Sequence, residues 1–576
     1  HGTILNRAPP SIRYPGCENP APGWAKLAAM HDPSQQTLRV LGVPQELDEG
    51  PEVLRERACR QAGIRPQDLV GMRLALRSLD ARRSRGILRF VCHVDLVVRT
   101  VHHSSALQKA LRSGRVREAP VDQALEMPPT RRGGPPRQAV VVGSGPAGLF
   151  AALTLARNGA GVTLIDRGAS LEQRHKRLVP FHRGGELDPD TNLLFGEGGA
   201  GTYSDGKLYT RVQDPLEQAI LQELVLAGAP PEILYDGRAH IGTDRLHRIL
   251  PALRQSLLDA GATILWDTKL EGMGFRKGPA RRIDRVFTNR GELACDALFL
   301  ALGHSARDTV EALSEQGLEL AAKPFQFGVR IEHPQELINA GRFGEHPLAA
   351  NLGAASYNLA LKGEADVAGA HTFCMCPGGK IVASISEPGL LCTNGMSNST
   401  HSSPFANAAV VTTIEPAAFA PFGRGPLAGL AFQRHFERSF FEAGGSSYRA
   451  PAQRVSDFLA GQASREVGRT SYTFGTTPGR IDHLLPAPIR AALARGLQRF
   501  DQLLPGFGGN SGILVGVESR SSSPLRMVRD RDTYLATGFE NCYPIGEGAG
   551  YAGGIMSAAI DGARAAQVRL SQSSIR

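Results

Sequence analysis

The feature that most constrains the fold is a glycine pattern between a short apolar strand and a helix. Residues 139–142 are apolar, and Gly143-Ser-Gly145-Pro-Ala-Gly148 follows at once, opening a helix that ends at Gly159. In this pattern the first glycine permits a sharp turn, the second lets the backbone touch a pyrophosphate, and the third lets the helix pack on the strand. Free N–H groups at such a helix start favour negative charge. The segment therefore predicts a βαβ unit that binds a dinucleotide.

The second strand of this unit, in the string GVTLIDRG, ends at Asp166 and is followed by Arg167. A carboxylate at that position is placed to accept hydrogen bonds from ribose hydroxyls, and it repels a 2′-phosphate. NADP is therefore disfavoured at this site. The fingerprint alone leaves FAD and NAD open.

A second glycine cluster, near the C-terminus, favours FAD. The string YPIGEGAGYAGGIMSAAIDGARAA (543–566) indicates a strand end, an acid, a run of glycines and an Ala-rich helix. Gly546 and Glu547 would lie at the ribityl and pyrophosphate position, and Gly553 and Gly554 would open the helix at Ile555. The N-terminus of that helix would point at the flavin, where its dipole stabilises a reduced, anionic ring. A plain NAD dehydrogenase has no use for this element.

Two further segments are expected beside the nucleotide. FGEGGAGTYSDGKLYT (195–210) has so much glycine that its backbone could pack against an isoalloxazine ring, although a glycine-rich surface loop is the alternative. LFLALGHSARD (298–308) is an apolar strand with a turn at its end. The expected cofactor contacts are Gly143, Gly145, Pro146, Ala147, Gly148, Asp166, Arg167, Gly198, Gly199, Gly201, Thr202, Ser204, Ala301, Gly303, Gly546, Glu547, Gly553, Gly554 and Ile555.

Several long strings together resemble one protein family. They include FGEGGAGTYSDGKLY, ALGHSARDT, KPFQFGVRIEH, FCMCPGGKIVASISEPG, TNGMSNS, GVESRSSSP and IGEGAGYAGGIMSAAIDG. The chain resembles, over about residues 37–566, the bacterial FAD-dependent dehydrogenases of the glutathione-reductase-like class, which also carry a small domain ahead of the FAD fingerprint. The resemblance implies a flavoprotein fold and FAD, and it implies little about the substrate.

The chain is too long for a single core. We expect an α/β fold: a Rossmann-like FAD-binding domain with an inserted mixed α+β substrate domain and a small N-terminal ferredoxin-like domain, suggested by a βαββα order. The expected parts are an extended segment (1–33), the ferredoxin-like domain (34–126), a linker (127–138), the first FAD-binding part (139–320), the substrate or cap domain (321–507) and the C-terminal FAD-binding part (508–576).

Candidates for the chemistry lie in loops. Four residues could act as base or acid: Glu197, Asp205 and Lys207 in the segment 195–210, and His401 in SNSTHSS. Arg520 could hold an anionic substrate with its guanidinium. Residues of these types are more often ordinary loop residues or flavin-phosphate contacts than catalytic groups.

Cysteine usage argues against a disulfide scaffold. The eight cysteines show no metal-finger spacing, so we assign no metal and expect a reducing cytoplasm. Cys374 and Cys376 form a C-M-C pair that could shuttle electrons or bind metal, but two thiols on one strand face are more simply inert core groups.

These observations favour an FAD-dependent oxidoreductase that moves a hydride between flavin N5 and a small organic substrate. No second dinucleotide fingerprint is present, so NAD(P)H would bind only transiently, at the open flavin face. A flavin monooxygenase that uses NAD(P)H is one alternative. The net charge of +10 raises another, an RNA-binding flavoprotein, but the predicted N-terminal strands lack a pair of stacking aromatics, so nucleic acid is not expected as a partner. No apolar run reaches membrane-spanning length, and the oligomeric state is open.

Overall fold

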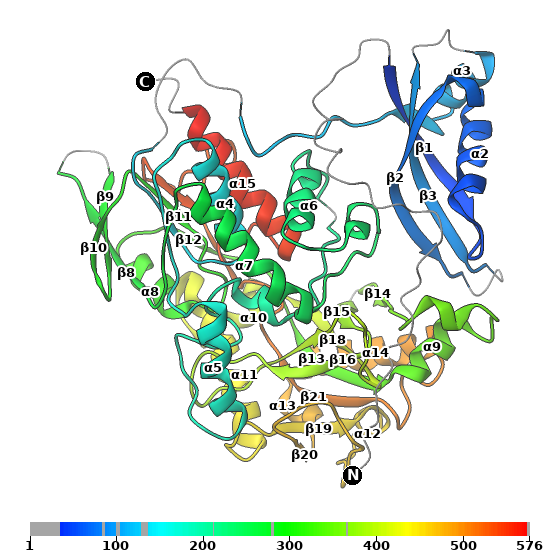
Figure 1. Cartoon of the computed structure of the whole chain (residues 1–576). Helices are drawn as coiled ribbons and strands as arrows, with labels where there is room; N and C mark the ends of the chain where they lie inside the picture. The colour runs from blue at the N-terminus through cyan, green and yellow to red at the C-terminus, as the bar shows by residue number, and fades with distance from the viewer. Residues whose placement is uncertain are drawn as a thin grey trace, which may run out of the picture. The chain divides into compact units, whose positions relative to one another are not determined.

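The computed structural model describes residues 35–82, 87–99, 104–127, 136–210, 212–277, 281–364 and 367–572. The chain divides into two compact units: unit 1 comprises 1–121, 234–238 and 343–353, and unit 2 comprises 122–233, 239–342 and 354–576. The expected segment 1–33 and most of the expected linker lie outside the described residues. Figure 1 labels the elements of both units.

Unit 1 contains a four-stranded antiparallel sheet in the order β2-β3-β1-β4. Apolar side chains of the strands and of two helices form a core of their own. The βαββαβ order is that of a ferredoxin-like domain. The elements are β1 (Gln35–Gln45), α2 (Pro51–Ala62), β2 (Leu69–Asp80), β3 (Arg89–Arg99), α3 (Ser105–Arg112) and β4 (Val116–Glu118).

Unit 2 is built on a five-stranded parallel sheet in the order β23-β11-β5-β6-β7. The strands are β5 (Ala139–Val142), β6 (Val162–Ile165), β7 (Thr263–Leu265), β11 (Ala297–Leu300) and β23 (Cys542–Pro544). All of β5 and β11 is buried, as expected of a parallel sheet covered on both faces. The predicted α/β class is therefore confirmed.

Two helices that lie far apart in the sequence pack side by side against this sheet. They are α4 (Pro146–Arg157), drawn in cyan, and α15 (Ile555–Gln572), drawn in red (Figure 1). A Cβ on Gly562 would lie 2.0 Å from the carbonyl oxygen of Ala147, so only glycine permits this approach. The remaining helices around the sheet are α5 (Leu171–His182), α6 (Glu217–Leu226), α7 (Thr243–Asp259) and α8 (Arg307–Glu315).

The chain forms a separate three-stranded antiparallel sheet between β7 and β11 in the sequence. Its strands are β8 (Leu270–Phe275), β9 (Ile283–Thr288) and β10 (Gly291–Ala294). Their buried apolar residues belong to the same core as those of β5, β11 and β23.

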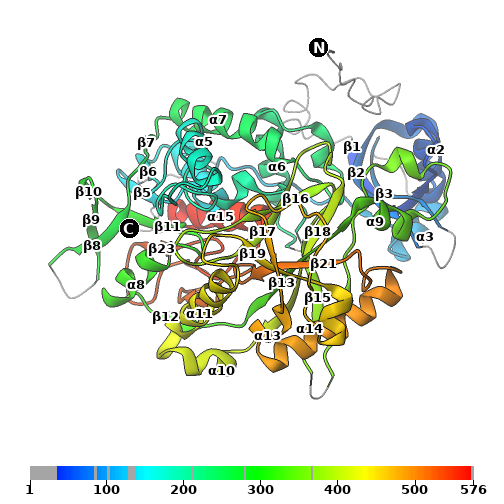
Figure 2. The ribbon, with the colours of Figure 1, turned by 90° about the horizontal axis from the view of Figure 1, so that it is seen from below.

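The second large sheet of unit 2 has seven strands in the order β14-β15-β18-β13-β21-β19-β20. Its strands are β13 (Phe325–Pro334), β14 (Ala360–Leu361), β15 (Ala370–Cys376), β18 (Phe405–Ile414), β19 (Ala450–Arg454), β20 (Thr476–Pro478) and β21 (Ile513–Glu518). Figure 2 shows α11 and α14 at this sheet. Two short pairs accompany it, β12 (Leu320–Ala322) with β22 (Leu525–Met527) and β16 (Gly379–Ala383) with β17 (Thr393–Ser397). The helices are α9 (Gln335–Phe343), α10 (Pro416–Phe419), α11 (Ala428–Ala443), α12 (Val455–Ala460), α13 (Ile481–Leu484) and α14 (Ala487–Leu503).

The position of β21 corrects one expected boundary. Residues 508–576 were expected to return to the FAD-binding sheet, but β21 pairs with β13 and β19 in the seven-stranded sheet. An apolar run such as ILVGV predicts a buried strand without indicating which of two sheets it joins.

Candidate functional site

The glycine turn after β5 has the geometry that its sequence predicts. Gly143 has a φ of +102°, and a Cβ there would lie 2.3 Å from the carbonyl oxygen of Ala301. A Cβ on Gly148 would lie 1.8 Å from the oxygen of Gly143. A Cβ on Gly145, by contrast, would meet no described atom within 4 Å. The backbone of Gly145 is therefore open to a ligand at the start of α4, where no side chain of the described chain caps the helix.

Asp166 makes more contacts within the chain than the sequence predicted. Its Oδ2 accepts hydrogen bonds from the N–H and the hydroxyl of Ser144, at 2.8 and 2.6 Å. Its Oδ1 accepts from the N–H groups of Gly168 and Gly196, at 2.9 and 3.0 Å. Four donors fill the acceptor positions of a carboxylate, so in this structure Asp166 fixes the glycine loop. Its contact with a ribose stays a prediction.

Arg167, the neighbouring candidate, lies in an ion-pair network. Its guanidinium contacts Asp190 and Asp308 at 2.5 and 2.8 Å and lies over the ring of Phe195. A cofactor contact of Arg167 also stays a prediction.

The segment 195–210 brings the two helix starts together. Gly198 N–H donates to the oxygen of Ser144 at 3.1 Å, and a Cβ on Gly199 would lie 3.1 Å from the Cα of Gly145. A Cβ on Gly201 would lie 3.7 Å from Ile555, the first residue of α15, and 3.9 Å from Pro146, the first residue of α4. The two N-termini therefore meet at one short stretch of glycine backbone.

The hydroxyl groups of this segment stay within it. Thr202 donates to the oxygen of Glu197 at 2.7 Å, and Ser204 donates to that of Gly201 at 2.7 Å. Both hold the shape of the loop, and their contact with a cofactor stays a prediction.

The C-terminal glycine segment presents bare backbone in the same way. Gly553 and Gly554 are exposed, and a Cβ on either would meet nothing within 4 Å among the described atoms. Gly303, at the end of β11, has similar space, and its backbone contacts Gly548 closely. Burial raises the pKa of Glu547 to about 7. An uncapped helix start, a second exposed one and open glycine backbone between them fit the phosphates and ring of FAD.

Glu197 has partners that explain its burial. Its Oε2 accepts from Leu171 N–H at the start of α5 and from the Arg254 guanidinium, at 2.8 and 2.7 Å. Its Oε1 has no hydrogen-bond partner in the part of the chain described. Burial raises the pKa of this carboxyl. The geometry favours a helix-capping role, and catalysis by Glu197 is not supported by any contact.

Asp205, Lys207 and His401 lie together, although the first and last of them are 196 positions apart in the sequence. Lys207 Nζ lies 2.5 Å from Asp205 Oδ2, His401 Nε2 lies 3.8 Å from Oδ1, and the Ser397 hydroxyl donates to Oδ1. The His401 ring stacks on that of His240 at 4.2 Å. Burial would raise the pKa of Asp205, but Lys207 and the two histidines outweigh it and lower that pKa.

These groups are close enough to hold a metal ion, since ligand atoms of Asp205, His240 and His401 lie within 4.8 Å of one another. The Lys207 ammonium, however, already pairs with Oδ2 of Asp205 and supplies a positive charge beside any ion held there. We therefore assign no metal to this cluster.

Lys207 also reaches a set of groups that the sequence did not connect. We call Lys207, Arg330, Cys374, Cys376 and Glu518 the thiol cluster. Lys207 Nζ lies 3.7 Å from Cys376 Sγ, and Arg330 contacts that sulfur at 3.6 Å and Glu518 Oε2 at 3.1 Å. Arg330 is fully buried on β13, so its neighbours had to supply counter-charge. The strings KPFQFGVRIEH and FCMCPGG contain Arg330 and the two cysteines, but they do not indicate that these residues meet.

The structure corrects the role predicted for Arg520. Its guanidinium is buried and gives two hydrogen bonds to Glu437, at 3.0 and 2.8 Å, and one to the Ser386 hydroxyl at 2.8 Å. Arg307 binds the same carboxylate from the other side, at 3.0 and 2.7 Å. The side chain is thus directed to Glu437, not to an anionic substrate.

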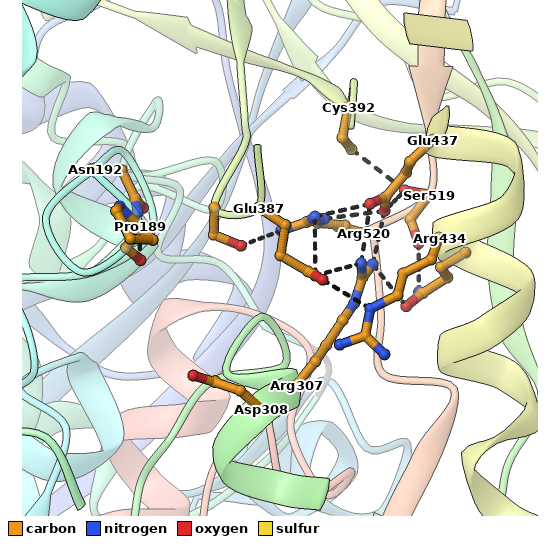
Figure 3. Close-up of polar contacts among 12 residues, drawn as sticks. Pro189, Asn192, Arg307, Asp308, Glu387, Cys392, Arg434, Glu437, Ser519 and Arg520 are labelled. Carbon is orange, nitrogen blue, oxygen red and sulfur yellow. Dashed lines mark hydrogen bonds and ion pairs between the residues drawn. The ribbon is translucent and has the colours of Figure 1, made fainter. Parts of the chain in front are cut away.

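Figure 3 shows this Glu437 cluster, in which the arginine side chains converge on Glu437 and Glu387. Its members are Arg307, Glu387, Arg434, Glu437 and Arg520. Burial would raise the pKa of Glu437, but Arg307 and Arg520 outweigh it and hold that pKa well below its usual range. The cluster joins α8, α11 and the end of β21, and it is structural.

Comparison with known proteins identifies the family. A family model described as "FAD binding domain" matches residues 137–197, and one described as "FAD-dependent protein, C-terminal domain-like" matches residues 324–521. An "Uncharacterized protein" of Clostridium beijerinckii is 38% identical over 538 residues, which cover 92% of this chain and 98% of that protein. The chain belongs to this family of bacterial FAD-dependent proteins. The predicted family, the Rossmann-type FAD-binding fold and FAD as the cofactor are confirmed.

Solved structures are similar to this FAD-dependent protein only at a distance. Glycine oxidase from Bacillus cereus is 9% identical with a TM-score of 0.35, covering 76% of this chain and 95% of that one. L-proline dehydrogenase from P. horikoshii is 12% identical with a TM-score of 0.31, covering 76% and 93%. L-amino acid deaminase from Proteus vulgaris is 12% identical with a TM-score of 0.31, covering 77% and 96%.

No helix among the described residues is long and apolar enough to cross a membrane.

Proposed function

We propose that this FAD-dependent protein is an oxidoreductase that moves a hydride between the flavin and a small organic substrate. The observation that carries the proposal is the meeting of the α4 and α15 N-termini at Gly201. Backbone N–H groups from both helices would hold the nucleotide, α4 at the pyrophosphate and α15 at the ring. When bound, FAD supplies the two-electron acceptor for the hydride.

The cluster around Asp205 would handle the proton that accompanies a hydride. Burial alone would lower the pKa of Lys207, but the thiols and Asp205 raise it, so the ammonium stays charged and serves electrostatically. Asp205 stays ionised and holds His401 at 3.8 Å. This leaves the His401 imidazole as the group we propose takes up or returns the substrate proton.

Nicotinamide use, partners and location remain predictions. We propose a small-molecule substrate and transient NAD(P)H binding at the flavin face, since the sequence has one dinucleotide fingerprint. No observation favours the monooxygenase or the RNA-binding alternative. The cytoplasmic location rests on cysteine usage alone.

The cofactor site can be tested with methyl groups that touch no protein atom. Gly145→Ala and Gly553→Ala each add a Cβ to open backbone at one of the two helix starts. If FAD lies there, each variant should fold normally and bind FAD at least about tenfold more weakly, because the methyl group overpacks the bound nucleotide. Fluorescence titration of the folded, FAD-free protein with FAD measures the affinity.

Gly479→Ala is the matched control, because a Cβ there also meets nothing within 4 Å among the described residues, yet lies outside the proposed site. Equal FAD affinity in all three variants would exclude the proposed placement.

Anaerobic titration of the holoprotein with NADH and NADPH would identify a nicotinamide donor. Admitting oxygen to the reduced protein would reveal monooxygenase-type absorbance if that alternative were correct.

A further inference from the structure

The C-M-C pair lies where its strand is irregular. β15 pairs with β18 regularly up to Phe373 opposite Ala409, and the next pair is Cys376 opposite Asn407, so β15 carries one extra residue. Cys374 has a φ of +43°, a left-handed conformation that a residue with a Cβ adopts only under constraint. Bulges of this kind redirect side chains and are common beside active sites.

Two cations contact this pair, at the sulfur of Cys376 and at the backbone of Cys374. Besides the contacts of Cys376 Sγ with Lys207 and Arg330, the Arg330 guanidinium holds the carbonyl oxygen of Cys374 at 2.8 Å. The Cys376 S–H donates to the carbonyl oxygen of Cys374 at 3.4 Å. Hydrogen bonding with the Cys376 side chain is the largest cause that lowers the pKa of Cys374, followed in that direction by the charges of Lys207 and Arg330.

Other cysteines have no such surroundings. Burial raises the pKa of Cys92 and Cys392 to about 11 and that of Cys295 to about 12. Among the cysteines that the structure describes, only Cys374 has a lowered pKa. Cys374 is also partly accessible, whereas Cys376 is buried. Accessibility and a lowered pKa thus distinguish Cys374 from the other described cysteines.

The pair also lies close to the site proposed for FAD. Lys207, which contacts Cys376, belongs to the segment whose Gly201 separates the starts of α4 and α15. Glu547 lies in the glycine segment that leads into α15; burial is the largest cause that raises its pKa, and the charge of Cys374 adds to it in the same direction.

From these contacts we propose that Cys374 and Cys376 form a redox pair that exchanges two electrons with FAD and passes them to an external disulfide. This rests on the proposed oxidoreductase function and assigns its electron acceptor by chemical class. Cys374 is the attacking thiolate, and Cys376 is the resolving thiol.

The steps balance in atoms and electrons. The Cys374 thiolate attacks an external disulfide, forms a mixed disulfide and expels one thiolate. The Cys376 thiol gives its proton to that thiolate, and its sulfur then attacks Cys374, releasing the second thiolate and leaving a Cys374–Cys376 disulfide. Bound FAD in its reduced, anionic form would supply the hydride equivalent that returns Cys374 to a thiolate and Cys376 to a thiol, and it would itself be oxidised.

Electron counting tests the proposal on the holoprotein. Anaerobic dithionite titration of the oxidised protein should consume about four electrons per FAD, two for the flavin and two for the disulfide. Cys374→Ser and Cys376→Ser should each consume about two, and Cys59→Ala, a buried control in unit 1, should consume about four. A count of two in the wild type would overturn the inference, while flavin reduction by an organic substrate would leave the proposed function intact.

A second measurement needs no variant. Iodoacetamide treatment of the reduced holoprotein, followed by peptide mass spectrometry, should modify Cys374 with a pH midpoint well below about 8.5, the pKa of a free thiol. The same protein should release thiol from 5,5′-dithiobis(2-nitrobenzoate) and end with the Cys374–Cys376 disulfide. Modification of Cys374 only above that pH, or a stable mixed disulfide without resolution, would contradict the assignment.

Discussion

The Glu437 cluster and the thiol cluster are both buried groups of charged residues in unit 2, but they differ in how fully their polar atoms are paired with hydrogen-bond and ion-pair partners. In the Glu437 cluster, Glu437 accepts four hydrogen bonds from two guanidinium groups and one from Ser519. In the thiol cluster, Lys207 and Arg330 both contact the Cys376 sulfur, at 3.7 and 3.6 Å, and burial raises the pKa of Glu518 to about 7 despite its contact with Arg330.

Buried charge by itself therefore does not identify a reactive site. Where partners match in number and geometry, as around Glu437, each group is fixed in one ionisation state and the cluster holds elements together. Where groups of similar proton affinity share too few partners, ionisation states can change near neutral pH, which is the property that chemistry requires.

The largest expected effect is on the satisfied cluster. Glu437→Gln should lower the free energy of unfolding by about 3–5 kcal/mol, because it removes the buried carboxylate that the Arg307 and Arg520 guanidinium groups share. Chemical denaturation of the FAD-loaded protein measures this. Glu466→Gln, which breaks an ion pair whose carboxylate is 82% exposed, should change almost nothing. A loss below 1 kcal/mol in Glu437→Gln would mean that the cluster is not the structural element we describe.

The next effect separates the clusters by pH. The folded-state pKa of Glu518, about 7, is above its ordinary value of 4.5, so its contribution to stability is complete below pH 4.5 and is lost as pH rises through 7. The wild type should therefore lose up to about 3 kcal/mol relative to Glu518→Gln over that window. Denaturation of both proteins at pH 4.5, 6 and 8 gives the difference.

Glu437 provides the contrast. Its pKa is lowered, so its contribution is present above pH 4.5 and is lost only as pH falls below it. The difference between wild type and Glu437→Gln should stay constant from pH 5 to 8. A slope there, or none for Glu518→Gln, would remove the distinction between the clusters.

A smaller effect concerns the thiols. Lys207→Met should raise the pH midpoint of Cys374 alkylation by about 1–2 pH units, because a nearby cation favours the thiolate. Asp205→Asn/Lys207→Met should give a smaller shift in the same direction, because the charge of Asp205 raises the pKa of Cys374, and a smaller stability loss, since no carboxylate is left unpaired. Lys380→Met, an exposed lysine on β16, is the control. An unchanged midpoint would show that Lys207 does not act on the pair.

The smallest effect is expected at the rim of the Glu437 cluster. Glu311 pairs with Arg434, and the two side chains are 35% and 29% exposed. Glu311→Gln should cost less than about 1 kcal/mol, because water screens such a pair. A cost equal to that of Glu437→Gln would extend the buried cluster to its rim.

The sequence predicted the parts of the site that depend on backbone alone. Gly143 and Gly148 are required by contacts within one βαβ unit, so their spacing sufficed to predict the turn. The glycines before Ile555 predicted a second helix start in the same way. Side-chain roles were harder to predict. Arg520 was expected to bind substrate because the sequence does not indicate that Glu437, 83 residues away, is its partner.

The chain by itself therefore determined the Rossmann-type unit, the family and FAD, because these depend on local steric requirements that a short string encodes. Only the tertiary structure decided which charges meet: Lys207 reaches Cys376 across 169 residues, and Arg330 reaches Glu518 because β13 pairs with β21. The physical reason is that strand pairing over long separations brings such side chains together, and no local periodicity records which strands will pair.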